Sequence, residues 1–195
     1  MKHLKTYAIL LALGLFSTAC KTDFIPEAID LDKLENGGYI RTVTPFPVDP
    51  TGQPKSFRFI LSNVNSTKME FVAEAVTPNK GAAFSSYELS IRFVDTTPSN
   101  GTKTGTSQPL KTIASSVFTK DAVTGYPRTT IVVSGTEALA ASKVALTDMS
   151  VGDRFEITGI MKLADGKVFT TTNTGLNITG GAFYSSPFLY RFWIE

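Results

Sequence analysis

Two stretches in which apolar and polar residues alternate strictly place the strongest constraint on the fold. In residues 87–93 (YELSIRF), Tyr, Leu, Ile and Phe alternate with Glu, Ser and Arg. Residues 154–163 (RFEITGIMKL) continue the pattern, with apolar side chains from Phe155 to Leu163 on one side. Successive side chains of a strand point to opposite faces of a sheet, so this period buries one face only. Both stretches therefore predict β-strands that are half-buried.

Further strands are predicted by the same pattern and by enrichment in β-branched and aromatic residues. The last of them is apolar on both faces, which is typical of a central strand. Asp165-Gly166 suits a type I′ turn, which would place Leu163 opposite Val168 in a hairpin. The additional strand ranges are 38–43, 56–62, 68–76, 110–113, 128–133 and 188–194.

One short helix is expected near residues 136–144. Ser134 and Glu137 have the spacing of a capping box, and residues 137–141 (EALAA) favour a helix. Roughly seven or eight strands, joined by connections rich in Gly, Pro, Asn and Ser, predict an all-β fold. We expect residues 37–195 to form a single β-sandwich, Ig-like or related, with long loops at 44–55, 95–109 and 171–187.

The N-terminus has the features of an export signal. Lys2 and Lys5 precede an unbroken apolar run over residues 7–16 (YAILLALGLF). Ten helical residues span about 15 Å, roughly half of the hydrocarbon core, which is too short for a permanent membrane span. A positive start, a short apolar run and the small residues at 17–19 are typical of a signal peptide. We expect residues 1–19 to be removed.

Cys20 is the only cysteine of the chain and directly follows those small residues. The stretch resembles the lipobox of bacterial lipoproteins, although Ser17 occupies the position where Leu is usual. This resemblance implies a diacylglyceryl group on the Cys20 sulfur and acylation, for example with palmitate, of the new amino terminus. Two or more acyl chains make attachment to a membrane durable. The alternative is a secreted protein with one stray thiol, which would have no disulfide partner.

Residues 20–36 are interpreted as the lipidated N-terminus and an acidic tether. Residues 21–36 hold five acids against Lys21 and Lys33. As a flexible coil they would reach about 20–25 Å. Acidic residues soon after the lipidated cysteine resemble the signal that sends some Bacteroidota lipoproteins to the cell surface. The alternative is a soluble spacer.

The composition excludes several classes of function once the signal peptide is removed. Lys2 and Lys5 leave with it, so the 19 basic residues become 17 against 17 acidic ones. A balanced charge without a basic cluster argues against nucleic acid as a partner. The only histidine, His3, is also lost, which excludes Ser-His-Asp and Cys-His catalysis and His-ligated zinc. A pair of carboxylates remains chemically possible, but no spacing singles one out, so we expect neither an enzyme nor a cofactor.

Several phrases, taken together and in this order, resemble a group of uncharacterised Bacteroidota outer-membrane lipoproteins. Members of this group resemble accessory lipoproteins of SusC/SusD-type TonB-dependent uptake systems. The resemblance implies a role in nutrient capture and carries no catalytic residues. The phrases are Tyr39–Thr42 (YIRT), Phe93–Gly101 (FVDTTPSNG), Leu110–Ala114 (LKTIA), Gly125–Arg128 (GYPR) and Gly180–Phe188 (GGAFYSSPF).

Three aromatic residues are candidates for contact with a ligand or partner. Phe183 and Tyr184 lie in a glycine-rich segment and could stack on a sugar or a peptide, the alternative being that both rings pack in the core. Tyr126, beside Pro127, lies in a predicted loop and could also contact a ligand or partner. The alternative is that its ring packs within the turn. Trp193 is expected to be a core residue.

Residues 95–97 (DTT) resemble the Bacteroidota O-glycosylation signal, which makes Thr96 a candidate for modification. The alternative is an ordinary loop threonine. Oxygen ligands are also available from Asp95, Asn100 and Gly101. The closely spaced acidic residues of a calcium loop are missing there, so no metal site is expected.

These observations predict a non-catalytic lipoprotein that is anchored to the outer membrane and exposed at the cell surface. We expect it to act as an accessory binding or docking subunit of a SusC/SusD-like complex, with a glycan or a peptide as its ligand. The alternative is a structural or adhesive surface lipoprotein without a small ligand of its own.

Overall fold

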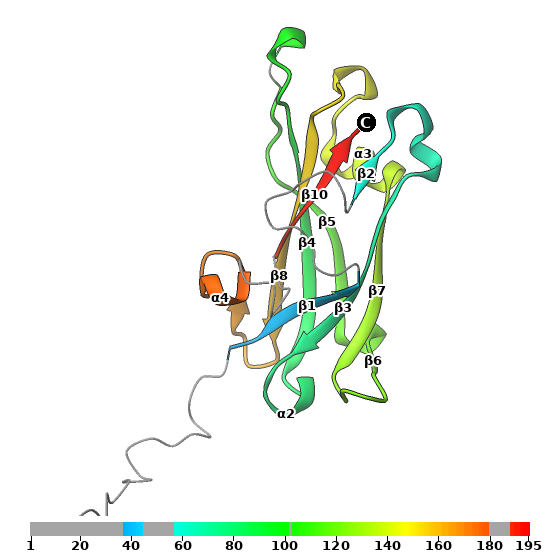
Figure 1. Cartoon of the computed structure of the whole chain (residues 1–195). Helices are drawn as coiled ribbons and strands as arrows, with labels where there is room; N and C mark the ends of the chain where they lie inside the picture. Colours follow the sequence, from blue (N-terminus) through cyan, green and yellow to red (C-terminus); the bar gives the residue numbers. More distant parts are fainter. Residues whose placement is uncertain (1–36, 45–56, 102, 180–187) are drawn as a thin grey trace, which may run out of the picture. The chain divides into compact units, whose positions relative to one another are not determined.

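Two β-sheets face each other in the computed structural model, which describes residues 37–44, 57–101, 103–179 and 188–195 (Figure 1). Residues Asn36–Glu195 form one compact unit. The predictions for the signal peptide, the tether and Cys20 lie outside the described residues, and so do those for Phe183 and Tyr184. The fold is all-β with few short helices, which confirms the predicted sandwich.

The smaller sheet has four strands in the order β1-β3-β7-β6, each antiparallel to its neighbour. Apolar residues at every second position of β3 point to the other sheet, as the alternation rule requires. The strands are β1 (Tyr39–Thr44), β3 (Lys68–Val76), β7 (Pro127–Ser134) and β6 (Thr119–Lys120).

The larger sheet has the order β2-β10-β8-β4-β5, with β9 paired to β8. Its centre is the long antiparallel pair of β8 and β4, whereas β2 and β10 run parallel. The strands are β2 (Arg58–Phe59), β10 (Leu189–Ile194), β8 (Arg154–Leu163), β4 (Phe84–Val94), β5 (Gln108–Ala114) and β9 (Val168–Phe169).

The helices are short and lie in the connections. The capping box predicted for α3 (Gly135–Ser142) is present, because the Ser134 hydroxyl accepts from the backbone N–H of Glu137 at 3.1 Å and the Glu137 carboxylate accepts from the backbone N–H of Ser134 at 3.4 Å. The remaining helical segments are α2 (Pro78–Gly81), α4 (Leu176–Thr179), η2 (Leu61–Ser66), η3 (Pro98–Asn100), η4 (Ser115–Val117) and η5 (Leu146–Asp148).

The core between the sheets is built largely of aromatic rings. Phe71 of β3 stacks on Tyr190 of β10, with ring centroids 4.4 Å apart, and so joins the two sheets. Phe59 contacts both Phe155 and Phe192 edge-on, at 5.2 and 5.4 Å. Edge-to-face and offset pairs of this kind stabilise a core beyond the area that they bury.

Two predictions of local structure were wrong in part. The strand expected over 56–62 is limited to β2, because the side chain and carbonyl of Asn63 bond to Ser66 and favour the turns of η2 over a ladder. The hairpin after β8 pairs Lys162 with Val168 and not Leu163. Its loop is one residue longer than a type I′ turn allows, and positive φ occurs at Gly166 alone of its residues.

Trp193 was predicted to lie in the core, but it lies half-buried on the outward face of β10. The alternation along β10 explains the difference, since Phe192 and Ile194 take the inward positions. The guanidinium of Arg154 lies over the Trp193 ring, 5.3 Å from its centroid.

Candidate functional site

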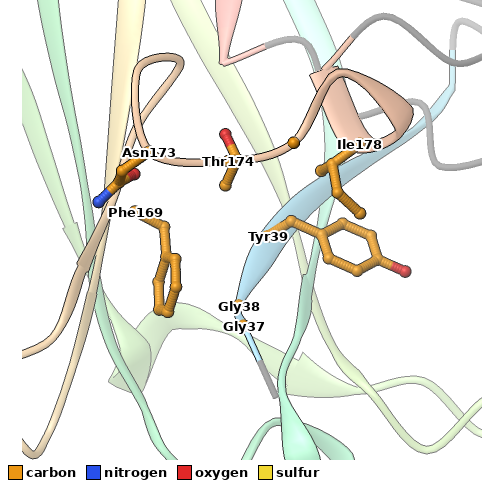
Figure 2. A pocket seen from close by; sticks show the side chains of 8 residues that line it. Gly37, Gly38, Tyr39, Phe169, Asn173, Thr174 and Ile178 are labelled. Carbon is orange, nitrogen blue, oxygen red and sulfur yellow. The ribbon is translucent and has the colours of Figure 1, made fainter. Parts of the chain in front are cut away.

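A hollow of about 330 Å³ lies where the chain enters the sandwich at the start of β1 (Figure 2). β1 contributes one wall, β9 a second, and the segment that runs into α4 the third. The lining residues are Gly37, Gly38, Tyr39, Phe169, Asn173, Thr174, Gly175 and Ile178.

The two glycines allow β1 to lie close to its neighbours. A Cβ on Gly37 would be 3.5 Å from the ring of Phe169. A Cβ on Gly38 would be 3.0 Å from the sulfur of Met161 and 3.3 Å from a methyl carbon of Thr77. A larger side chain at position 38 would push β1 away from β8, so the glycine pair sets the width of the hollow.

The segment above the hollow is held by its own hydrogen bonds. The Asn173 side chain accepts from the backbone N–H of Thr170 at 2.7 Å and donates to the Val168 carbonyl at 2.6 Å. The Thr174 hydroxyl donates to the Thr170 carbonyl. Because these polar groups are already hydrogen-bonded within the segment, they fix the shape of this wall. The Phe169 ring and the Ile178 side chain are then the main surface that a bound ligand could contact.

The lining combines aromatic and aliphatic carbons with hydroxyl and amide groups. Tyr39 is the single titratable residue among the eight, so the hollow offers neither a carboxylate pair nor an acid–base couple. Aromatic rings beside glycine backbone and hydroxyl groups suit the C–H face of a sugar or an apolar side chain of a peptide. The predictions from sequence missed this site, because Gly37 leads into a strand of one sheet and Phe169 belongs to the other, and only the packing of the two sheets brings them together.

Tyr126 does not line this hollow. It lies half-buried between β6 and β7, and the ammonium group of Lys80 lies 4.7 Å from its ring centroid. Lys80 also donates to the Thr124 carbonyl at 3.2 Å. These contacts favour the turn-packing alternative for Tyr126, since one face of the ring already carries a cation.

Thr96 is exposed, but its hydroxyl belongs to a loop network. It donates to the Gly152 carbonyl at 2.8 Å and is 3.3 Å from the Asp153 carboxylate, which is itself fully buried. A sugar on this oxygen would remove the donor, so modification of Thr96 would have to break both contacts.

Asp95 closes the turn that follows β4. Its carboxylate accepts from the backbone N–H groups of Thr97 and Lys103, both at 2.9 Å. The hydrogen bonds from Lys103 and Thr97 lower the pKa of Asp95. The carboxylate is thus used as a turn cap, and within the described part of the chain no group of three or more His, Cys, Asp or Glu side chains is placed to hold a metal ion.

A buried carboxylate holds the outer face of the smaller sheet. Glu74 is fully buried although its strand position points outward, and it accepts from Arg41 and from Nε of Arg128. The Thr124 hydroxyl donates to it at 2.9 Å, and Arg128 also pairs with Asp121 at 2.8 Å. Positive and negative charges are balanced in this group, which indicates a structural role.

A search of protein-family models and a search of curated proteins both return no match to the chain. The chain is accordingly described by its fold and its site. It is an all-β sandwich with a largely apolar hollow, lined by no Asp or Glu, at the start of its first described strand. Over the residues that the structure describes, no helix is long and apolar enough to cross a membrane.

Proposed function

We propose that this chain is a non-catalytic, lipid-anchored protein of the outer-membrane surface. In this proposal it is an accessory binding or docking subunit of a SusC/SusD-like nutrient-uptake complex. The observation that carries the proposal is the place of Cys20, the single cysteine, directly after a positively charged start and a ten-residue apolar run. A thiol in that position has a chemical use as a lipid acceptor and no disulfide partner within the chain.

The position of the hollow supports a role close to the membrane. Gly37, its first lining residue, follows Cys20 by 17 positions. The 16 residues between them would extend about 20–25 Å as a flexible coil. The hollow, with Phe169 and Ile178 in its lining, would then lie close enough to the bilayer to contact a transporter in the same membrane.

The lining also supports a choice of ligand class. The hollow joins ring and aliphatic carbons to hydroxyl groups without a carboxylate, which suits a sugar ring or a peptide side chain. Its volume accommodates one such unit at a time.

Mass analysis and co-purification of the tagged full chain in mild detergent test the proposal. We expect a processed, acylated N-terminus at Cys20 and a co-purifying TonB-dependent transporter. Cys20→Ala is expected to lose the lipid and the membrane association. A bare thiol, or a terminus elsewhere, would contradict the anchor. Recovery of the lipidated chain alone would favour a structural or adhesive surface protein.

Matched substitutions at the hollow test its part in binding. Phe169→Ala removes the ring and is expected to weaken binding in a screen of glycans and peptides at least about tenfold. Val168→Ala, the exposed neighbour on the same strand, is the control and should leave binding unchanged. Tyr126→Ala and Tyr184→Ala test the two aromatic candidates outside the hollow. Equal binding by the Phe169 and Val168 variants would place the ligand site elsewhere.

A further inference from the structure

Three arginines surround one carboxylate on the outward face of the larger sheet. Arg92 of β4 and Arg191 of β10 each lie directly opposite Glu156 of β8, and Arg154 lies two residues before Glu156 on the same face. The strand order β10-β8-β4 therefore brings Arg92 and Arg191, which are far from Glu156 in the sequence, to its two sides.

The carboxylate is already fully engaged by its neighbours. One Glu156 oxygen accepts from Nε and a terminal nitrogen of Arg154 at 3.1 and 3.0 Å, and the other accepts from Arg92 at 2.5 Å. Burial would raise the pKa of Glu156, but the hydrogen bonds from Arg92 and Arg154 outweigh it and lower the pKa. Glu156 is thus ionised and cancels one of the two positive charges of Arg92 and Arg154, which leaves one positive charge in surplus over these three side chains.

Arg92 is the arginine with spare hydrogen-bonding capacity. Its contact with Glu156 uses one terminal nitrogen, and among the described residues the other guanidinium nitrogens have no protein partner. Its side chain is 47% exposed, against 20% for Arg154. Arg154 is held in place by Glu156 and by the ring of Trp193, so Arg92 is the one that is able to receive a second anion.

A hollow of about 270 Å³ lies beside Arg92. It is lined by Arg92, Ser107, Glu156 and Thr158. Ser107 directly precedes β5 and Thr158 lies on β8, the two strands that flank β4, and a hydroxyl from each can donate to an oxyanion bound in this hollow. Ser90, paired with Thr158 on the neighbouring strand, continues the row of hydroxyls along the face.

The side chains on this face favour a carbohydrate over a protein partner. Protein interfaces are anchored by large apolar or aromatic side chains in their centre. Among the described residues, the large apolar side chains with more than a third of their surface exposed lie outside β4, β5, β8 and β10, and the half-buried ring of Trp193 is already covered by Arg154. A face of hydroxyls around a cation instead matches the hydroxyl groups and the acidic substituent of a charged sugar.

We propose that this face of the larger sheet binds an acidic polysaccharide, with a carboxylate or sulfate group seated between Arg92, Ser107 and Thr158. This site is separate from the hollow at the start of β1, and it requires neither the lipid anchor nor a transporter.

Binding by the purified full chain in mild detergent tests this site independently of the anchor and of any complex. The probes are polygalacturonate, dextran sulfate, neutral dextran, poly-L-glutamate and sodium sulfate, measured by calorimetry at low and high salt. We expect binding of at least one of the two acidic polysaccharides, weakened by salt, and no binding of neutral dextran. Binding of poly-L-glutamate alone, equal affinity for sodium sulfate, or no binding of either acidic polysaccharide would overturn the proposal.

Charge-matched variants distinguish a specific site from general attraction. Arg92→Gln is expected to weaken binding of the acidic polysaccharide about tenfold or more, because it removes the spare donors. Lys120→Gln, an exposed cation on β6 of the other sheet, should stay within about twofold of the wild type. Thr158→Val, with an unchanged thermal melt, provides a second variant that keeps every charge and should also weaken binding. Equal losses in the Arg92 and Lys120 variants would overturn the site.

Discussion

The phenol of Tyr87 lies over Gly159 of the neighbouring strand. A Cβ at position 159 would come within 1.9 Å of the Tyr87 hydroxyl oxygen and 2.3 Å of the ring carbon that bears it. Both residues are buried in the interior face of the β4–β8 pair. The glycine in the middle of β8 is therefore required by the ring that covers it and not by its backbone conformation.

Gly159→Ala is expected to lower the free energy of unfolding by about 2–3 kcal/mol, because the methyl group overpacks a core that has no free space at this point. Chemical denaturation of the wild type and the variant measures the difference. Gly105→Ala is the control, since its Cβ would stay 3.9 Å from the nearest heavy atom, a side-chain carbon of Phe93. Replacing Tyr87 by Leu in the Gly159→Ala background should recover part of the loss. Simple additivity of the two changes would contradict the contact.

Tyr87→Phe and Tyr190→Phe are expected to have opposite effects on stability. The Tyr87 hydroxyl is buried beside that of Tyr190, and no described residue meets it with the distance and angle of a hydrogen bond. Its removal should raise the free energy of unfolding by up to about 1 kcal/mol. The Tyr190 hydroxyl is 2.9 Å from that of Thr42, which is itself fully buried. Removing it leaves Thr42 unpaired and should cost about 1–2 kcal/mol in urea titrations. A loss of stability in both variants would show that the Tyr87 hydroxyl has a partner.

Stability is expected to fall in alkaline solution. Burial raises the pKa of Tyr190 to about 12 and raises the pKa of Tyr87 well above its ordinary value. Phenols of the unfolded chain lose their protons near pH 10, while these two keep theirs when folded. The free energy of unfolding should therefore be unaffected by these groups below pH 10 and should decrease as the pH rises from 10 toward 12.

Denaturation curves at pH 9, 10 and 11, together with the tyrosinate absorbance at 295 nm, measure this effect. Tyr190→Phe removes one of the two groups and should flatten the decrease. An equal slope in the variant would mean that Tyr190 does not carry the dependence.

The strands that the sequence predicted best are those whose alternation is long and regular. The ranges predicted for β3 and β8, 68–76 and 154–163, match the observed bounds, and α3 begins at its predicted capping box. The strand at 56–62 was predicted from a shorter stretch of the same pattern, and local bonds made by Asn63 ended it after β2. Alternation and capping patterns thus predict that a strand or helix forms, while hydrogen bonds made by side chains such as Asn63 determine where it ends.

The sites could not be predicted in this way because they depend on strand order. Arg92, Glu156 and Arg191 each occupy a polar position on a predicted strand, but nothing local shows that their strands are neighbours. Phe169 and Gly37 meet at the hollow beside β1 because the two sheets pack on each other, which nothing local shows either. The sequence gives the face on which each side chain lies, and long-range pairing decides which faces become sites.

Glu74→Gln is expected to destabilise the chain far more than the same change at Glu70 on the same strand and face. Glu74 is fully buried, pairs with Arg41 and Arg128, and accepts a hydrogen bond from the Thr124 hydroxyl. Loss of its charge therefore leaves two guanidinium groups without their shared counter-ion. Breaking a buried ion pair from one side costs about 3–5 kcal/mol. The two arginine side chains remain 33% and 25% exposed, and water screens part of this cost, so we expect about 2 kcal/mol.

Glu70 is the matched control for this prediction. It pairs only with Lys68 at 2.7 Å in the described part of the chain, and both side chains are about half exposed. Exposed pairs of this kind contribute less than about 1 kcal/mol, so Glu70→Gln should lie close to the wild type in thermal and chemical denaturation. Because the loop between β6 and β7 reaches Glu74 through Thr124 and Arg128, the Glu74 variant should also show faster hydrogen exchange in this loop. Equal effects of the two substitutions would mean that Glu74 is reached by water and that the loop is held by other contacts.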